Sequence, residues 1–154
     1  MWYRLLQKLE AELRAATGKD VKIGAYPPIT ANISTDGSVF LIRGEETNQD
    51  PTTQERVRVT FYLETWVNEG DPDYAVGSEK LVTLETQIED ALIAYRNRVG
   101  SLDQSACMLD ERWQVLDVYV DKKAGDLDSR RPILGTQYTL VAQLFDTSDV
   151  EGIW

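Results

Sequence analysis

A long alternation of apolar and polar residues constrains this chain more than any other feature of its sequence. Between Val57 and Glu64, within the segment Glu55–Val67, every second residue is apolar. Successive side chains of a β-strand point to opposite faces, so the segment is predicted to be a strand with one face on a core and the other toward solvent or a partner. The apolar set is Val57, Val59, Phe61 and Leu63, and the opposite set is Arg58, Thr60, Tyr62 and Glu64.

Two other segments have the apolar spacing of amphipathic helices, Trp2–Thr17 and Glu79–Val99. Gly18 and Gly100 stand where C-terminal caps belong, and Ser78 is the expected N-cap of the second helix. Each helix has a single apolar stripe, so each is expected to lie on a sheet. The stripes are Trp2, Leu5, Leu6, Leu9 and Leu13 in the first helix, and Leu81, Leu84, Ile88, Ala91, Tyr95 and Val99 in the second.

Several shorter patterns supply the remaining strands. An Asp36-Gly37 turn between apolar runs predicts a hairpin, and two polar stretches predict long loops. The whole chain, residues 1–154, is therefore expected to be one α+β domain, with a mainly antiparallel sheet and two helices packed on one face. The expected strands are Val21–Ile23, Ile29–Ser34, Val39–Arg43, Trp113–Asp121 and Ile133–Phe145, and the expected loops are Gly44–Gln54 and Asp121–Pro132.

The composition excludes several classes of function. The 154 residues include no histidine, which removes imidazole-based nucleophiles and zinc sites with histidine ligands. The single cysteine, Cys107, allows no disulfide within the chain and is expected to be buried. A net charge of -10 is unsuited to gripping nucleic acid, and no phosphate-binding motif occurs. No segment has the features of an export signal or a membrane span.

Acidic residues are common, but their spacing supports no site. Pairs of acidic or amide residues two apart, such as Asp71 and Asp73, do not continue as a calcium loop. Glu85 and Glu89 share one helix face, where a solvated acidic surface beside Arg96 is expected in preference to a carboxylate pair for glycoside hydrolysis. We expect no enzyme activity, no cofactor and no metal.

The candidate functional residues are those of an interface. The basic residues of the Asp121–Pro132 loop are either an ordinary hairpin tip or a contact with the acidic face of an identical subunit, which would favour head-to-tail association. The outer face of the Glu55–Val67 strand mixes aromatic and charged residues, as subunit interfaces do. The terminal Ile153-Trp154 either has no fixed contact or anchors in a neighbour's groove. The candidates are Lys122, Lys123, Arg130, Arg131, Arg58, Tyr62, Trp66 and Trp154.

The order of these segments resembles the tail terminator, or tail completion, proteins of long-tailed bacteriophages. The resemblance is one of architecture over most of the chain and carries no catalytic motif. Those proteins open with an amphipathic helix, continue through a proline-containing extended segment and a long alternating strand, and end with a second helix and two strands. The corresponding parts are Trp2–Thr17, Tyr26-Pro27-Pro28-Ile29, Arg56–Glu64, Glu79–Val99 and Val115–Leu144, with Arg131–Val141 similar to the last strand.

The resemblance implies a non-enzymatic assembly protein of the virion, built in the host cytoplasm. Six copies would form a ring that caps the tail tube, stops its polymerisation and meets the neck or connector. DNA would pass through the ring without specific binding, because an acidic channel repels phosphates. Two alternatives stay open: a head–tail connector or neck subunit, and a small-molecule-binding α+β domain with an apolar pocket.

Overall fold

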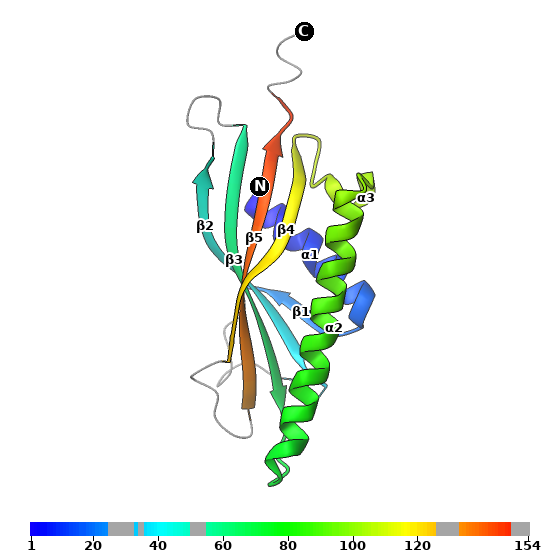
Figure 1. Ribbon diagram of the computed structural model, residues 1–154, viewed down its shortest axis with the longest axis vertical. Coiled ribbons are helices and arrows are strands. Elements are labelled where there is room, and N and C mark those ends of the chain that lie inside the picture. The colour runs from blue at the N-terminus through cyan, green and yellow to red at the C-terminus, as the bar shows by residue number, and fades with distance from the viewer. Residues whose placement is uncertain (25–32, 34–35, 50–54, 126–132, 149–154) are drawn as a thin grey trace.

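The computed structural model describes residues 1–24, 33, 36–49, 55–125 and 133–148 (Figure 1). Three helices and five strands follow one another along the chain, and the long strands run beside the longest helix. In chain order the elements are α1 (Trp2–Thr17), β1 (Asp20–Ile23), β2 (Ser38–Asn48), β3 (Arg56–Asn68), α2 (Tyr74–Gly100), α3 (Gln104–Cys107), β4 (Trp113–Gly125) and β5 (Ile133–Asp146).

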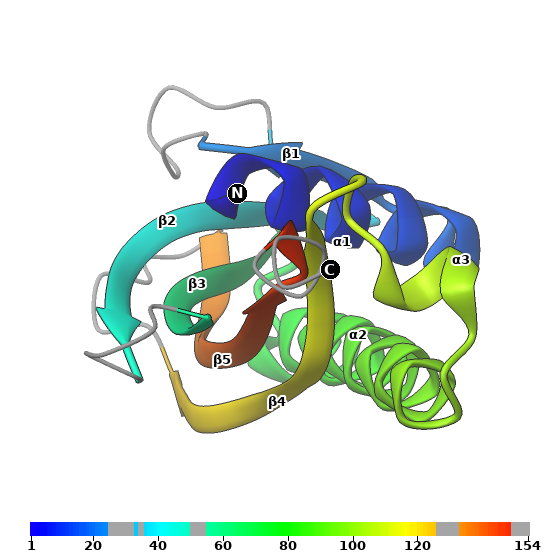
Figure 2. The ribbon, with the colours of Figure 1, turned by 90° about the horizontal axis from the view of Figure 1, so that it is seen from above.

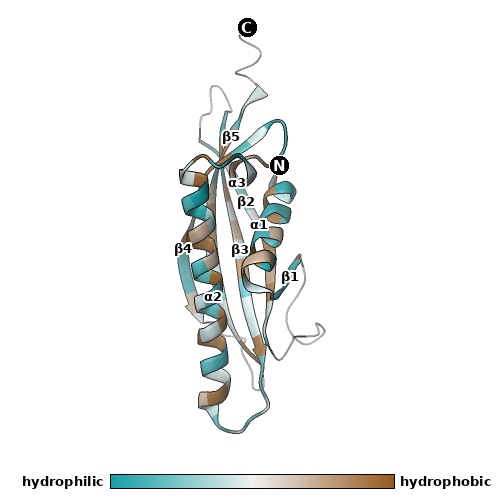
Figure 3. Ribbon diagram, turned by 90° about the vertical axis from the view of Figure 1, so that its right-hand side faces the viewer, coloured by the Kyte–Doolittle hydropathy of each residue, from teal (hydrophilic) through white to brown (hydrophobic). Residues whose placement is uncertain are grey.

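The five strands form one sheet in the order β1-β2-β3-β5-β4. Strand β1 runs parallel to β2, and every other neighbouring pair is antiparallel. Seen from above, α1 and α2 lie on the same side of the strands (Figure 2), and from that side they stand in front of the sheet (Figure 3). The predicted fold class, an α+β fold with two helices on one sheet face, is confirmed.

Helix α1 has the bounds that its sequence predicts. Its leucines Leu5, Leu6, Leu9 and Leu13 are buried against the sheet and α2. Gly18 ends the helix in the left-handed conformation, with φ of 67°, and its N–H donates to the carbonyl of Arg14. A residue without a Cβ adopts this conformation at little cost, which explains why the helix ends there.

The helices cover the face of β3 that carries its alternating apolar residues. Val59, Phe61 and Leu63 are buried there, beside Leu140 of β5 and Ile88 of α2. Removing this apolar surface from water is the main favourable contribution to folding. One core therefore joins both long helices to the four longest strands.

Helix α2 begins five residues earlier than predicted. Asp73 is the N-cap, and its carboxylate accepts a hydrogen bond of 3.0 Å from the Ala75 N–H. The prediction of a start at Glu79 with Ser78 as N-cap is wrong. A glycine such as Gly77 lowers helix propensity. It is buried here, and an added Cβ would lie 3.0 Å from Leu134, so close packing explains why this helix contains a glycine.

Two strands extend into segments predicted as loops. Strand β2 continues through residues 44–48, after a bulge between Ile42 and Glu45. A Cβ on Gly44 would lie 2.0 Å from the Thr60 carbonyl oxygen, so the bulge requires glycine. Strand β4 likewise passes Asp121 and reaches Gly125. Both extensions are exposed, which explains their polar composition. Of the rest of the predicted loops, the structure describes only Gln49.

Other predictions have mixed outcomes. Except for the buried Ile33, the expected strand Ile29–Ser34 lies outside the described residues, so the predicted hairpin is untested. Cys107 is buried, as expected, at the end of the short α3. Among the described helices, none combines the length and the apolar content needed to cross a membrane.

Candidate subunit interface

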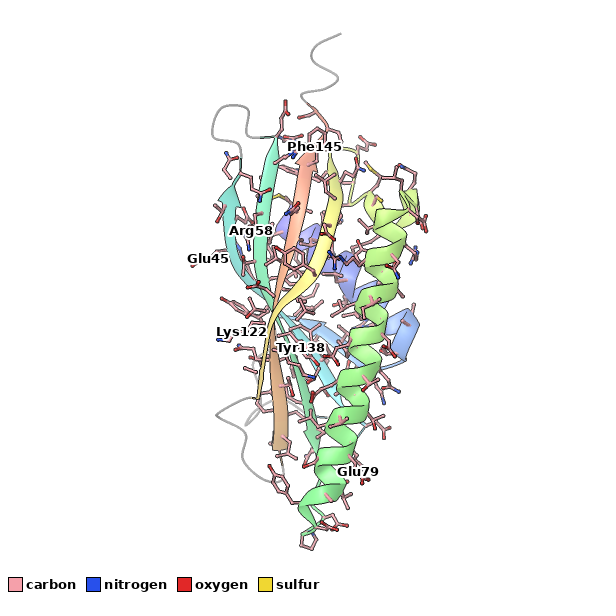
Figure 4. All side chains as sticks on the ribbon, in the orientation of Figure 1. Glu45, Arg58, Glu79, Lys122, Tyr138 and Phe145 are labelled. Carbon is pink, nitrogen blue, oxygen red and sulfur yellow. The ribbon has the colours of Figure 1, made fainter. Side chains whose placement is uncertain are left out.

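The face of the sheet opposite the helices carries three of the candidate residues. Arg58 and Tyr62 occupy this face on β3, and Lys122 occupies it on β4. Thr139 of β5 pairs with Tyr62 on one side and with Lys122 on the other, so Tyr62, Thr139 and Lys122 form one row across the three strands. Figure 4 shows Arg58 and Lys122 over the strands, away from α2. We call this surface the uncovered face.

The uncovered face carries unpaired cations in an acidic chain. Its register-paired positions include Arg56, Arg58 and Lys122, none of which forms an ion pair with another described residue. The acids at such positions are the exposed Glu45, the buried Glu64 and Asp117, which pairs with Arg96 of α2. The remaining positions carry both polar and apolar side chains. Basic, aromatic and amide side chains together suit contact with an acidic partner surface.

Lys123 points to the other side of the sheet. Its Nζ lies 2.9 Å from Glu85 Oε2 and 3.1 Å from Glu89 Oε1, both on α2. Burial by itself would lower the pKa of Lys123, but its hydrogen bonds to Glu85 and Glu89 outweigh burial and raise the pKa above its ordinary value. Lys123 therefore joins β4 to α2 within its own chain, and its contact with a neighbouring subunit stays a prediction.

The pair Glu85 and Glu89 is also not the solvated acidic surface that was predicted. Glu85 is only 9% exposed and accepts a further hydrogen bond of 3.2 Å from the Thr136 hydroxyl. Arg96, expected beside the pair, instead forms a bidentate contact with Asp117 of β4. Ion pairs of Lys123 and of Arg96 thus join α2 to β4 at two places along the seam between these elements.

Trp66, predicted as an interface residue on the outer face of β3, is instead buried inside its own chain. It is 1% exposed and packs with Ile33, Phe40 and Ile133. Its indole Nε1 donates a 3.0 Å hydrogen bond to Glu64. A Cβ on Gly135, the residue paired with Trp66 on β5, would lie 2.4 Å from the ring. Trp66 thus fills the space that a glycine leaves on the neighbouring strand.

Three candidates, Arg130, Arg131 and Trp154, lie outside the described residues and stay predictions. In the sequence, Arg130 and Arg131 lie between β4, which ends at Gly125, and β5, which begins at Ile133.

The outward surface of α2 was missed by sequence analysis. Val82 and Ile93 are 59% and 58% exposed, although both are apolar. They lie outside the predicted apolar stripe and eleven residues apart, which is close to three helical turns. This second apolar repeat could have indicated the exposed surface from the sequence, but the longer first stripe accounted for the helix on its own.

Two hollows of about 490 Å³ each open along the seam between α2 and β4. Leu81, Val82 and Glu85 contribute to one, and Ile93 and Val120 to the other. Within the described part of the chain, no three Cys, Asp or Glu side chains are grouped closely enough to hold a metal ion.

No known protein family matches the sequence, and no curated protein matches it. Among solved structures, the chain is similar to one from the virion of a native gene transfer agent particle, at 11% identity and a TM-score of 0.47, with 92% of this chain and 94% of that one covered. It is also similar to one from the sheath/tube terminator, in the extended state, of an extracellular contractile injection system (PVC). There the identity is 15% and the TM-score 0.38, with 92% of this chain and 56% of that one covered.

Proposed function

We propose that this chain, as a single domain spanning residues 1–154, is a subunit of a ring that terminates the tail tube of a phage-like particle. Six copies join head to tail, cap the finished tube, stop its polymerisation and present a surface to the neck or connector. The subunit has no enzymatic role and needs no cofactor. It is built in the host cytoplasm and becomes part of the virion.

One observation carries the proposal: helices cover one face of a long sheet, no described helix covers the other face, and Arg58, Thr60 and Tyr62 are only half-buried there. The uncovered face combines aromatic and basic side chains, as contact surfaces do. Strand β4, thirteen residues long, is also an edge strand. Exposed edges invite pairing with other chains unless something protects them. Contacts of one surface with a different surface on the next copy close into rings when the rotation allows.

The charge distribution supports passage of DNA through such a ring. The chain has a net charge of -10, while Arg56, Arg58 and Lys122 of the uncovered face have no ionic partner among the described residues. Burying that face between subunits leaves the acidic remainder of each subunit at the surface, including the channel. Acidic walls repel phosphates, so DNA slides without being bound.

Tube assembly tests the proposal directly. The tube protein of the same particle is polymerised with and without the purified chain, and tube length and ends are measured by electron microscopy. The expected result is tubes that stop growing and carry added density at one end. Tubes of unchanged length distribution would contradict a terminator. Binding to the isolated neck assembly without any effect on tubes would support the connector alternative instead.

A further inference from the structure

Along one face of α2, apolar residues and threonines are exposed between the charged positions. The exposed positions between Glu79 and Asn97 include Val82, Thr83, Thr86, Ile93 and Ala94. The Thr83 and Thr86 hydroxyls donate to the carbonyls of Glu79 and Val82 within the helix, at 2.9 and 3.0 Å. Their hydrogen-bonding capacity is thus partly used inside the helix. We call the surface formed by residues 79, 82, 83, 86, 90, 93 and 94 the outward stripe.

The charges that remain on the outward stripe are negative. Glu79 and Asp90 form no ion pair with any other described residue. The cations beside them are engaged elsewhere, since Lys80 pairs with Glu69 and Arg96 with Asp117. The outward stripe therefore combines exposed apolar surface with two unpaired carboxylates. This combination fits a partner that offers unpaired cations beside aromatic or aliphatic surface.

The uncovered face of the same chain offers that chemistry at a matching distance. The rise of a helix places the Cα atoms of Glu79 and Asp90, eleven residues apart, about 16 Å from each other. Arg58 pairs with Gln143, and Lys122 pairs with Thr139 on the same strand. Arg58 and Lys122 are therefore two strand spacings apart across the sheet and four residues apart along it. Together these place their Cα atoms about 16 Å from each other as well. Figure 4 shows Glu79 of α2 on the opposite side of the chain from Arg58 and Lys122.

We propose that the outward stripe of α2 in one copy packs on the uncovered face of the next, with Glu79 and Asp90 opposite Arg58 and Lys122. This inference rests on the proposed ring and names its subunit contact. Because one surface meets a different surface, every copy offers one of each, and addition of subunits continues until the ring closes.

Charge reversal on either surface tests the contact. The helix-reversed variant is Glu79→Lys with Asp90→Lys, and the sheet-reversed variant is Arg58→Glu with Lys122→Glu. Each should weaken assembly at least about tenfold, because like charges then face each other. A chain with all four changes should assemble to within about threefold of the unchanged protein. A matched control, Arg4→Glu with Lys22→Glu, changes two exposed cations on α1 and β1 and should leave assembly unchanged.

A chemical cross-link gives a second readout that needs no stable ring. Thr86→Cys lies on the outward stripe, Thr139→Cys lies on the uncovered face, and the native Cys107 is buried. The double-cysteine protein, treated with a short bismaleimide, should give a ladder of dimers, trimers and larger species on a denaturing gel. Each single-cysteine variant should stay monomeric, as should the control pair Thr86→Cys with Ala15→Cys.

The outcomes separate this inference from the proposed function. Rings that form with no sensitivity to either reversal would overturn the inference and leave the terminator proposal standing. So would the absence of a ladder in an assembled protein. A ladder and charge-sensitive assembly, together with tubes whose length does not respond to the chain, would support the contact and overturn the terminator proposal.

Discussion

The two faces of the sheet differ in what they contribute to this molecule. On the helix-covered face, β3 buries Val59, Phe61 and Leu63, and no exposed charge interrupts them. On the uncovered face, the alternate residues Arg58, Thr60 and Tyr62 of the same strand are only half-buried. One strand thus serves the fold with one set of residues and, in our proposal, the assembly with the other. The comparison implies that stability and assembly can be perturbed separately.

The adjacent aromatic residues Phe61 and Tyr62 give the sharpest test of that separation. Phe61→Ala should lower the free energy of unfolding by about 3–5 kcal/mol, because it leaves a cavity in the core. Tyr62→Ala should lower it by about 1 kcal/mol, as expected for a half-buried side chain. Urea denaturation of the two variants measures both values. Equal losses would remove the distinction between the faces.

The contact between Trp66 and Gly135 is the place where the uncovered face does contribute to stability. Gly135→Ala should cost about 1–3 kcal/mol, because the added methyl group overlaps the indole. Gly125→Ala is the matched control, since it lies at the end of β4 with nothing within 4 Å of the added atom. Thermal unfolding compares the two variants. A neutral Gly135→Ala would show that the ring is not packed on that glycine.

Substitution of Asp146 tests whether polar contacts at the end of β5 add to the stability of the fold. Arg112 donates two hydrogen bonds to its carboxylate, at 2.9 and 2.6 Å, and these hold the pKa of Asp146 well below its usual range. Asp146→Asn should cost about 1–2 kcal/mol near neutral pH.

The cost of Asp146→Asn should also depend on pH. A carboxyl whose pKa is lower in the folded state adds stability above its unfolded pKa of about 4, and loses it as the pH falls toward the folded value. The difference between the original protein and Asp146→Asn should therefore shrink from about pH 5 downward. A difference that stays constant down to about pH 2 would contradict the ion-pair explanation.

The neighbours Lys122 and Lys123 give the smallest effect and the closest control. Lys123→Met removes the partner of the buried Glu85 and should cost about 1 kcal/mol of unfolding free energy. Lys122→Met should change it by less than about 0.5 kcal/mol but should weaken assembly. Chemical denaturation and sedimentation velocity separate the two quantities. If Lys122→Met lowered the unfolding free energy and Lys123→Met weakened assembly, the assignment of the two lysines to opposite faces would be wrong.

The outcome for these lysines shows where sequence reasoning reaches its limit. Alternation along β4 indicates a strand, but a bulge between Val120 and Lys122 changes which residues face the helices. The burial of Trp66 likewise depends on Gly135, which is distant in sequence. By contrast, α1 and the start of β3 were predictable because their patterns are local. The fold class followed from such local patterns, whereas the candidate interface also depended on bulges and on pairing between distant residues.

The most direct test of the central claim is native mass spectrometry of the unchanged protein across a range of concentrations at near-physiological ionic strength. The account predicts a closed species of six times the 17.5 kDa chain, present without larger open polymers and replaced by monomer in the sheet-reversed variant. A protein that stays monomeric at every concentration, and also when mixed with tail tubes, would contradict it.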